Sequence, residues 1–306
     1  MDVEGLKTFL AVYRQRSFSN AARVLNRTQP AISNRIHLLE QELGMPVFER
    51  TTAGIMLSQA GRVLLPYAER VLASVQDADA AMQSLATENA GPVAIAIVGT
   101  LAGTRITQTL KRFVDAHPTV DLTLQTARST EVSELVRRGE ATIGLRYDRD
   151  RSSDLDYRIL THEKLLVACA PNHPLARQSI SFFSELLNER WIAFPEIQGQ
   201  REIWASHVFS IFSVLGHSDL NWMPVDSLTA QKRLVEAGFG LALMTESSIA
   251  EERASGAMRT IDVNDLTARM PIFSVTRKGG FLSAGASSLL GILFAEFAAG
   301  SLTANS

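Results

Sequence analysis

Residues 17–50, SFSNAARVLNRTQPAISNRIHLLEQELGMPVFER, decide the fold of the N-terminal part of the chain. Ser17 and Thr28 each predict the start of a short helix, because an N-cap hydroxyl accepts a hydrogen bond from a free backbone N–H group. Gly44 is typical of the position just after a helix, where the backbone turns left-handed. An amphipathic helix is also predicted for residues 4–15, so the order of elements indicates a helix-turn-helix.

The helix that follows Thr28 has one apolar face and one polar face. Ile32, Ile36 and Leu39 recur at helical spacing, which leaves short hydrogen-bonding side chains on the opposite face. Five arginines and no acidic residue lie within positions 14–35, and phosphate binding needs such a local positive field. A helical bundle with a solvated charged face would show the same spacing, but the ordered series of helices and hairpin favours DNA binding.

Two short strands are predicted after this helix, at residues 47–50 and 55–57, with the turn near Gly54. Such a hairpin beside a helix-turn-helix is a β-wing. Arg50 in the first strand is placed to reach the DNA backbone or the minor groove.

A long helix is predicted from Ser58 to about Thr87, with Pro66 interrupting its early part. Apolar residues recur along it with the alternating spacing of four and three that is typical of a coiled-coil seam. The seam consists of Leu64, Ala68, Val71, Val75, Ala78, Met82 and Leu85. A helix of this length needs a partner for its apolar stripe, which is either a second copy or the body of its own chain.

The chain breaks at residues 88–92, ENAGP, and changes character after them. Short β-rich runs then alternate with helical patterns up to about residue 298. This alternation predicts an α/β fold with mainly parallel sheets. The segment is long for a domain built on one sheet, and its length is typical of two such domains.

Composition and motifs exclude several classes of protein. The net charge of the chain is −2, so any DNA contact must come from a local patch. Cys169 is the only cysteine, which excludes an internal disulfide, and its apolar surroundings predict a buried thiol. No metal-ligand, Walker or nucleophile-elbow pattern is present, so neither enzymatic activity nor a cofactor is predicted. No signal peptide and no membrane span are predicted, and a cytoplasmic, nucleoid-associated protein is expected.

The N-terminal stretch resembles that of LysR-type transcriptional regulators. The resemblance rests on residues 17–22 (SFSNAA), 28–33 (TQPAIS), 39–44 (LEQELG) and 48–50 (FER). It is dense over residues 5–65, and the rest of the chain agrees in length and order of elements. It implies an α/β fold plus a small mainly helical domain: an N-terminal winged helix-turn-helix, a long linker helix, and a C-terminal effector domain of two subdomains like those of type 2 periplasmic solute-binding proteins.

The resemblance also implies where the domains end. The expected DNA-binding domain is residues 1–57, the linker and dimerisation helix is residues 58–88, and the effector-binding domain is residues 91–302. Subdomain 1 is expected to comprise residues 91–161 and 268–302, and subdomain 2 residues 162–267.

In this family a recognition helix enters the major groove. The matching residues here are Thr28, Gln29, Pro30, Ser33, Asn34 and Arg35, with Arg50 in the wing. Many members have arginine directly after the serine that matches Ser33, whereas this chain has Asn34 there and its arginine one position later. Asparagine pairs with adenine and arginine with guanine, so which of Asn34 and Arg35 contacts a base stays open.

Open α/β sheets bind ligands beyond the carboxyl ends of their strands, often at helix N-termini. The loops at these ends supply hydroxyls, backbone N–H groups and arginines, which suits a small anion such as a carboxylate. The candidate effector-binding residues are Thr100, Leu101, Ala102, Arg128, Ser129, Thr130, Arg146, Phe194, Gln200, Arg201 and Ser227. Thr100 is the strongest of them, because it matches the family's usual effector contact. Each hydroxyl could instead cap a helix, and each arginine could form a surface ion pair.

The resulting hypothesis is a LysR-type, sequence-specific transcriptional regulator of double-stranded DNA, modulated by a small-molecule effector. A homodimer or homotetramer is expected, with RNA polymerase as a further partner. The alternatives are a solute-transport component, from residues 91–306 alone, and an α/β enzyme. The helix-turn-helix opposes the first, and the absence of an acid–base or nucleophile constellation opposes the second. The effector, the promoters and the sign of regulation stay open.

Overall fold

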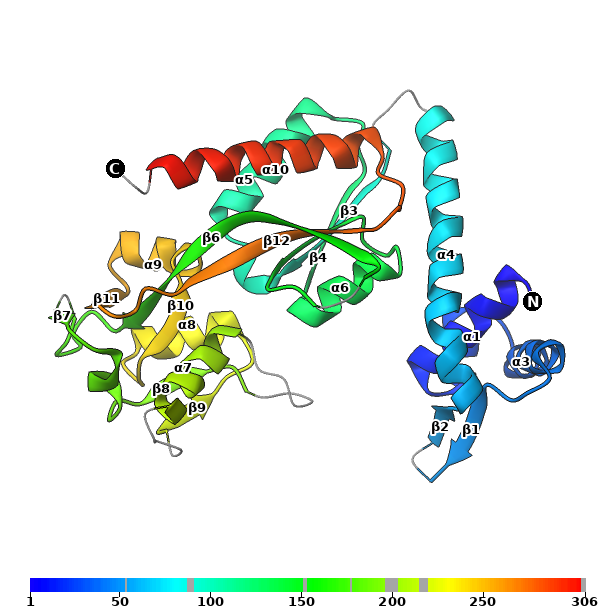
Figure 1. Cartoon of the computed structure of the whole chain (residues 1–306), viewed down its shortest axis with the longest axis horizontal. Helices are drawn as coiled ribbons and strands as arrows, with labels where there is room; N and C mark the ends of the chain where they lie inside the picture. The colour runs from blue at the N-terminus through cyan, green and yellow to red at the C-terminus, as the bar shows by residue number, and fades with distance from the viewer. Residues whose placement is uncertain are drawn as a thin grey trace.

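The computed structural model describes residues 1–52, 54–86, 91–150, 153–176, 178–195, 203–214 and 220–303. It contains a small helical module near the N-terminus, a single long helix, and a larger body in which helices cover a curled sheet (Figure 1). This is the predicted fold class, a small mainly helical domain followed by an α/β body.

The N-terminal module consists of three helices and a two-stranded hairpin. These are α1 (Val3–Gln15), α2 (Phe18–Val24), α3 (Gln29–Leu43), β1 (Phe48–Thr51) and β2 (Gly54–Leu57). Ser17 Oγ accepts a hydrogen bond from the backbone N–H of Asn20 at 3.3 Å, and Thr28 Oγ1 accepts one from Ala31 at 3.4 Å. Both predicted N-caps are therefore confirmed. Gly44 ends α3 with a φ of +71°, also as predicted.

The module has a hydrophobic core of its own. Ile32, Leu39 and Phe9 are buried in it together with residues from the start of the long helix. The ring of Phe48, in the wing, lies 5.3 Å from that of Phe9 and 6.0 Å from that of Phe18. The wing is thereby fixed to the helices, and the polar face of α3 is turned away from the core.

The predicted long helix is present as α4 (Gln59–Ala86) and continues through Pro66. Its predicted apolar seam is only partly correct. Leu64 and Ala68 are buried in the core of the N-terminal module, whereas Met82 and Leu85 are exposed. The cause is that the first half of α4 packs on α1 of its own chain, so only the remaining apolar residues are left for another partner.

The body is built on an eight-stranded sheet of order β4-β3-β5-β12-β6-β11-β7, with β10 also paired to β6. The strands are β3 (Val93–Val98), β4 (Leu122–Ala127), β5 (Ile143–Tyr147), β6 (Leu155–Cys169), β7 (Ser179–Ile180), β10 (Ala242–Thr245), β11 (Arg259–Val263) and β12 (Arg269–Arg277). β3 pairs in parallel with β4 and β5, as the α/β pattern predicts. The central pair, β6 and β12, is antiparallel, which corrects the expectation of mainly parallel sheets.

The sequence pattern also missed most of β6. Only residues 165–170 have the apolar, β-rich pattern that predicts a strand, whereas β6 begins at Leu155 and pairs with all of β12. The first part of β6 is rich in charged and exposed residues, such as Asp156 and Arg158. Its extended conformation depends on a partner strand far along the chain, which a local pattern does not report.

β6 and β12 run between two groups of elements (Figure 1). The first group joins β3, β4 and β5 to three helices, with α5 and α10 on one face and α6 on the other. The second group contains a separate parallel pair of strands, β8 and β9. The further bounds are η1 (Gly99–Leu101), α5 (Thr104–Ala116), α6 (Ser129–Arg137), η2 (Phe183–Leu186), β8 (Trp191–Ala193), α7 (Ile203–Val214), β9 (Trp222–Pro224), α8 (Leu228–Glu236), η3 (Ser247–Ile249), α9 (Ala250–Ser255) and α10 (Ala284–Thr303).

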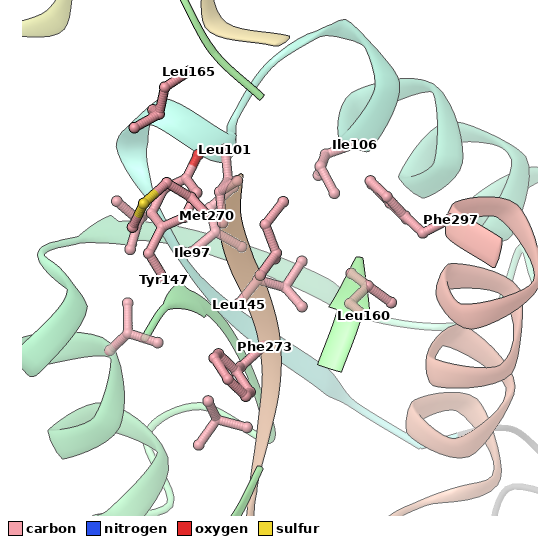
Figure 2. Close-up of a cluster of buried hydrophobic side chains, with 14 of the residues drawn as sticks. Ile97, Leu101, Ile106, Leu145, Tyr147, Leu160, Leu165, Met270, Phe273 and Phe297 are labelled. Atoms are coloured by element: carbon pink, nitrogen blue, oxygen red, sulfur yellow. The ribbon is translucent and has the colours of Figure 1, made fainter. Parts of the chain in front are cut away.

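One large core runs through the body. Figure 2 shows Ile97 and Leu145, from the parallel strands, beside Phe273 on β12. Leu165 on β6 and Met270 on β12 are buried in the same cluster. The crossing strands are thus packed into the first group of elements and also lead into the second. This is the curled two-subdomain architecture expected of a type 2 fold.

Candidate functional site

The candidate DNA-contacting residues lie at the start of α3. Thr28, Gln29, Pro30 and Asn34 are exposed, whereas Ser33 and Arg35 are half-buried. The side-chain amide of Gln29 donates a hydrogen bond to Ser33 Oγ at 2.8 Å. The first two turns of α3 therefore present amide and hydroxyl groups to solvent, which are the groups that contact base edges and phosphates.

Asn34 and Arg35 differ in their surroundings. Arg35 Nη2 lies 3.3 Å from Asp2 Oδ2. The other oxygen of Asp2 accepts a hydrogen bond from the backbone N–H of Gly5 at 2.8 Å and so caps α1. Arg35 is therefore directed along the side of α3 that faces the start of α1, while Asn34 is on the exposed face.

The predicted positive field around α3 is only partly available. Arg16, Arg23 and Arg27 are exposed, but Arg14 Nη2 lies 2.6 Å from Glu140 Oε1 in the body. Arg50 is in β1 opposite Ile55, and its side chain lies outside the described part of the structure.

The candidate effector residues of the first subdomain lie at adjacent strand ends. Val98 pairs with Ala127, so the loop after β3 is next to the loop after β4. Thr100 is 7% exposed and Ser129 is 9% exposed, and neither side-chain oxygen has a hydrogen-bond partner. Arg128 and Thr130, on either side of Ser129, are exposed. The structure thus brings together two buried hydroxyls and an exposed arginine at the N-terminus of α6.

Leu101 and Ala102 complete the loop after β3 but offer no polar side chain. Leu101 is buried in the main core, and Ala102 packs against it.

A buried polar cluster at the same place was missed by the sequence analysis. The Tyr147 hydroxyl donates a hydrogen bond to Glu163 Oε2 at 2.7 Å. Thr100 and Thr245 lie beside that hydroxyl, yet neither Oγ1 has a hydrogen bond of acceptable geometry. Burial raises the pKa of Glu163, and burial together with Glu163 raises the pKa of Tyr147 well above its ordinary value.

This cluster joins the two subdomains. Tyr147 ends β5 of the first group, Glu163 is on the crossing strand β6, and Thr245 ends β10 of the second group. The loops meet here too, since a Cβ added at Gly103 would lie 3.6 Å from the carbonyl oxygen of Ser247. These side chains therefore bridge the two subdomains.

Arg146 is bound within the protein. It is 4% exposed, its Nε donates to the carbonyl of Tyr147 at 3.2 Å, and its Nη1 lies 3.3 Å from Asp150 Oδ2. It also donates a hydrogen bond to Ser133 on α6. The geometry favours a supporting role for Arg146 over direct contact with a ligand.

The remaining candidates belong to the second subdomain. Ala193 pairs with Pro224, so the chain after β8 lies beside the chain after β9. Phe194 follows β8 and packs against the main core, and Ser227 Oγ caps α8 by accepting a hydrogen bond from Ala230 at 3.4 Å. Gln200 and Arg201 lie outside the described residues.

The single cysteine lies in the body, in strand β6. Cys169 is buried, and burial raises the pKa of its thiol to about 11, which agrees with the predicted inert thiol. The described residues contain no group of three or more side chains able to hold a metal ion. Among the helices they form, none combines the length and apolar character of a membrane span.

Comparison with known proteins identifies the family. Residues 3–62 match the bacterial regulatory helix-turn-helix protein model of the LysR family, and residues 86–298 match the LysR substrate binding domain. The transcriptional regulator CbbR of Rhodospirillum rubrum is 29% identical over 94% of each chain. A probable cat1 operon transcriptional activator of Acinetobacter lwoffii is 30% identical over 81% of this chain and 82% of its own.

The fold of a solved regulator agrees. Full-length CbnR complexed with its target DNA aligns with a TM-score of 0.63 at 23% identity, over 97% of this chain and 98% of its own. The matched family consists of transcriptional regulators, which decides against both the transport component and the enzyme. The chain belongs to the LysR family of helix-turn-helix transcriptional regulators, with an N-terminal DNA-binding module and a C-terminal effector domain.

Proposed function

We propose that this regulator binds an interrupted palindrome as a homodimer or homotetramer, and that a small anionic effector held between the two subdomains modulates its activity. The observation that carries the DNA part is the exposed polar face at the start of α3. Two such helices in a dimer would contact two half-sites. A cytoplasmic, nucleoid-associated location and contact with RNA polymerase remain predictions from the family.

The proposed DNA contacts are Thr28, Gln29, Pro30, Ser33, Asn34 and Arg35, with Arg50 in the wing. Exposure supports Asn34 as the residue that contacts a base, and the pairing of Arg35 with Asp2 supports a phosphate or structural role for Arg35. Specific binding is tested by selection from a random library of duplexes. We expect enrichment of an interrupted T…A palindrome, and the absence of any enriched motif would overturn sequence-specific binding.

The proposed domain division is residues 1–57, 58–88 and 91–302, with the second subdomain at residues 162–267. It is supported by the course of β6 and β12, which run between the two groups of elements.

The exposed apolar residues of α4 support oligomerisation. Val63, Tyr67, Val71, Met82 and Leu85 are all exposed and lie along one side of the helix. Because contiguous exposed apolar surface is costly in water, a second copy is its proposed partner.

The proposed effector site centres on Thr100 and the N-terminus of α6. An unpaired buried hydroxyl costs about 1–3 kcal/mol, so a ligand group that pairs with Thr100 and Ser129 would be favoured. Arg128 and the α6 N-terminus favour an anion. Both hydroxyls are covered in this arrangement, so ligand entry requires the subdomains to separate, and binding then shifts the balance between two arrangements.

Thermal-shift screening of small carboxylates tests the effector site, because a ligand that binds only the folded state raises its stability. We expect at least one carboxylate to raise the melting temperature of the wild type. Thr100→Val removes an unpaired hydroxyl at nearly constant shape, so this variant should be at least as stable as wild type but should lose the response. A full response in Thr100→Val would overturn the assignment.

A further inference from the structure

The turn that follows α6 lies against α4 and α1 of the same chain. α4 and α6 are in contact although they belong to different parts of the molecule. The turn itself is Arg138-Gly139-Glu140.

Three ion pairs cross this junction. Arg138 Nε lies 2.8 Å from Glu69 Oε1 on α4, and Arg14 Nη2 on α1 lies 2.6 Å from Glu140 Oε1. Arg277, at the end of β12, pairs with Asp77 on α4. We refer to these three pairs, Glu69–Arg138, Arg14–Glu140 and Asp77–Arg277, as the linker contact.

The backbone of the turn also touches α4 closely. A Cβ added at Gly139 would lie 2.4 Å from Gln76 Oε1 and 3.5 Å from Ala73 Cα. Gly139 has a φ of +74°, so any side chain there would be strained as well. The glycine thus allows the turn to approach α4 at this point.

The junction is polar and incompletely packed. The buried apolar residues form separate clusters on its two sides. A cavity of about 380 Å³, lined by Gln76, Asp77 and Gly139 among others, lies within it. A second of about 350 Å³ is lined by residues that include Arg14, Glu69 and Arg138. Charges rather than close apolar packing therefore hold the two parts together, which is typical of an interface that can separate.

Glu69 is the most deeply buried of the six residues that form the linker contact. It is 6% exposed, and a buried carboxylate without its partner is costly. By contrast, the side chains of Arg14 and Glu140 are each more than a third exposed, and exposed ion pairs contribute little to stability. Loss of the Glu69–Arg138 pair should therefore weaken the linker contact most.

The same helix reaches the proposed effector site. The first residue of α6 is Ser129, whose hydroxyl is one of the unpaired groups there. Its last residue, Arg137, donates a hydrogen bond at 2.7 Å to Asp154, which directly precedes β6. The linker contact thus lies just after α6. The first residue of α6 is at the proposed effector site, and its last residue is hydrogen-bonded to the residue that precedes the crossing strand β6.

We propose that the linker contact reversibly docks the effector domain on the linker helix of its own chain, and that α6 couples its strength to occupancy of the effector site. The second half rests on the proposed function, whereas the docking itself does not. When the contact opens, the DNA-binding module is free to change its position relative to the body.

Hydrogen exchange of the full-length protein tests the docking. Glu69→Gln keeps the shape of the side chain, and Arg138→Gln replaces the guanidinium by a shorter neutral amide. Each should speed amide exchange several-fold in the element to which it does not belong: α6 and its turn for the first, the middle of α4 for the second. Arg112→Gln is the matched control, because Arg112 pairs with Glu296 on the α5–α10 face, away from α4. It should leave exchange in α4 unchanged.

The charge-swapped double variant Glu69→Arg/Arg138→Glu should restore part of the protection that each single variant loses. Unchanged exchange across the junction in both single variants, or no restoration in the double variant, would overturn the docking. A circular-dichroism melt of each variant verifies that it is folded. If one single variant does not fold, the other single variant still tests the docking.

Hydrogen exchange of the wild type with and without the carboxylate that raises its melting temperature tests the coupling to the effector site, because exchange in the turn after α6 should change when the carboxylate binds. Binding to the selected palindrome tests whether opening of the contact reaches the DNA-binding module. Affinity should change several-fold in Glu69→Gln and Arg138→Gln, neither of which is in α3, and should not change in Arg112→Gln. Unchanged exchange on carboxylate binding would overturn the coupling to the effector site, and equal affinities in all four proteins would overturn transmission to the DNA-binding module. Failure of the wild type to bind any selected duplex would instead count against the proposed function and leave the exchange result standing.

Discussion

Asn34 and Arg35 are neighbours in α3 but face different groups. Arg35 is half-buried beside Asp2, whereas Asn34 is exposed on the face opposite the core. A bidentate contact to the correct base is worth about 1–3 kcal/mol of discrimination. We expect Asn34→Ala to weaken specific DNA binding by about that amount, and Arg35→Ala to weaken it by less, because Arg35 must first leave Asp2.

Fluorescence anisotropy with the selected duplex and with a scrambled one measures this difference. Gln41→Ala is the control, since Gln41 is exposed two turns further along the same face of α3. A larger loss of discrimination in Arg35→Ala than in Asn34→Ala would show that the arginine is the base contact.

Single residues also show what the sequence could and could not reveal. Ser17, Thr28 and Gly44 were predicted correctly because capping depends on residues within one turn of the chain. The pairing of Arg35 with Asp2 and of Tyr147 with Glu163 joins positions on different elements. No local pattern reports such pairs, so these parts of the candidate site required the structure.

At the scale of elements, α4 divides its apolar residues between two partners. Leu64 and Ala68 are already covered by the N-terminal module, whereas Met82 and Leu85 are exposed. We expect Met82→Glu and Leu85→Glu to weaken oligomerisation without lowering the stability of the single chain, because both side chains are exposed there. Sedimentation should then show a species of 33.5 kDa. Gln83→Glu, which adds the same charge on the opposite side, should remain oligomeric, and assembly unaffected by all three changes would contradict the proposed partner.

The strand β6 places a titratable group, Glu163, between the subdomains. Because burial raises the pKa of Glu163, the folded state keeps its proton at a pH where the unfolded state has lost it. Stability from this group is complete below the ordinary value of 4.5 and is lost as pH rises towards the raised value. Glu163→Gln keeps an acceptor for the Tyr147 hydroxyl and does not ionise. The melting temperature of wild type relative to this variant should therefore fall as pH rises through that window.

Scanning fluorimetry in buffers from below pH 4.5 upward measures the trend. Asp115→Asn is the control, because Asp115 is more than half exposed and pairs with Lys111 on α5, away from Glu163. A constant difference between wild type and Glu163→Gln, or one that changes in the opposite direction, would contradict the raised pKa.

At the scale of the whole molecule, the described residues form a first core in the N-terminal module and a second, main core in the body, with a smaller cluster beside it. The module and the body are joined by α4 and by a polar junction. Separate cores with a weak interface need not unfold together. We expect calorimetry of the full-length protein to show two heat-absorption transitions. Leu39→Ala and Leu145→Ala each remove a buried side chain, from the first and the second core respectively, and each should cost about 2–5 kcal/mol. Each variant should lower one transition and leave the other in place, and Glu69→Gln should separate the two further. A single transition that shifts as a whole in both leucine variants would mean that the junction is strong enough to make one cooperative unit, which a contact held by charges around two cavities does not favour.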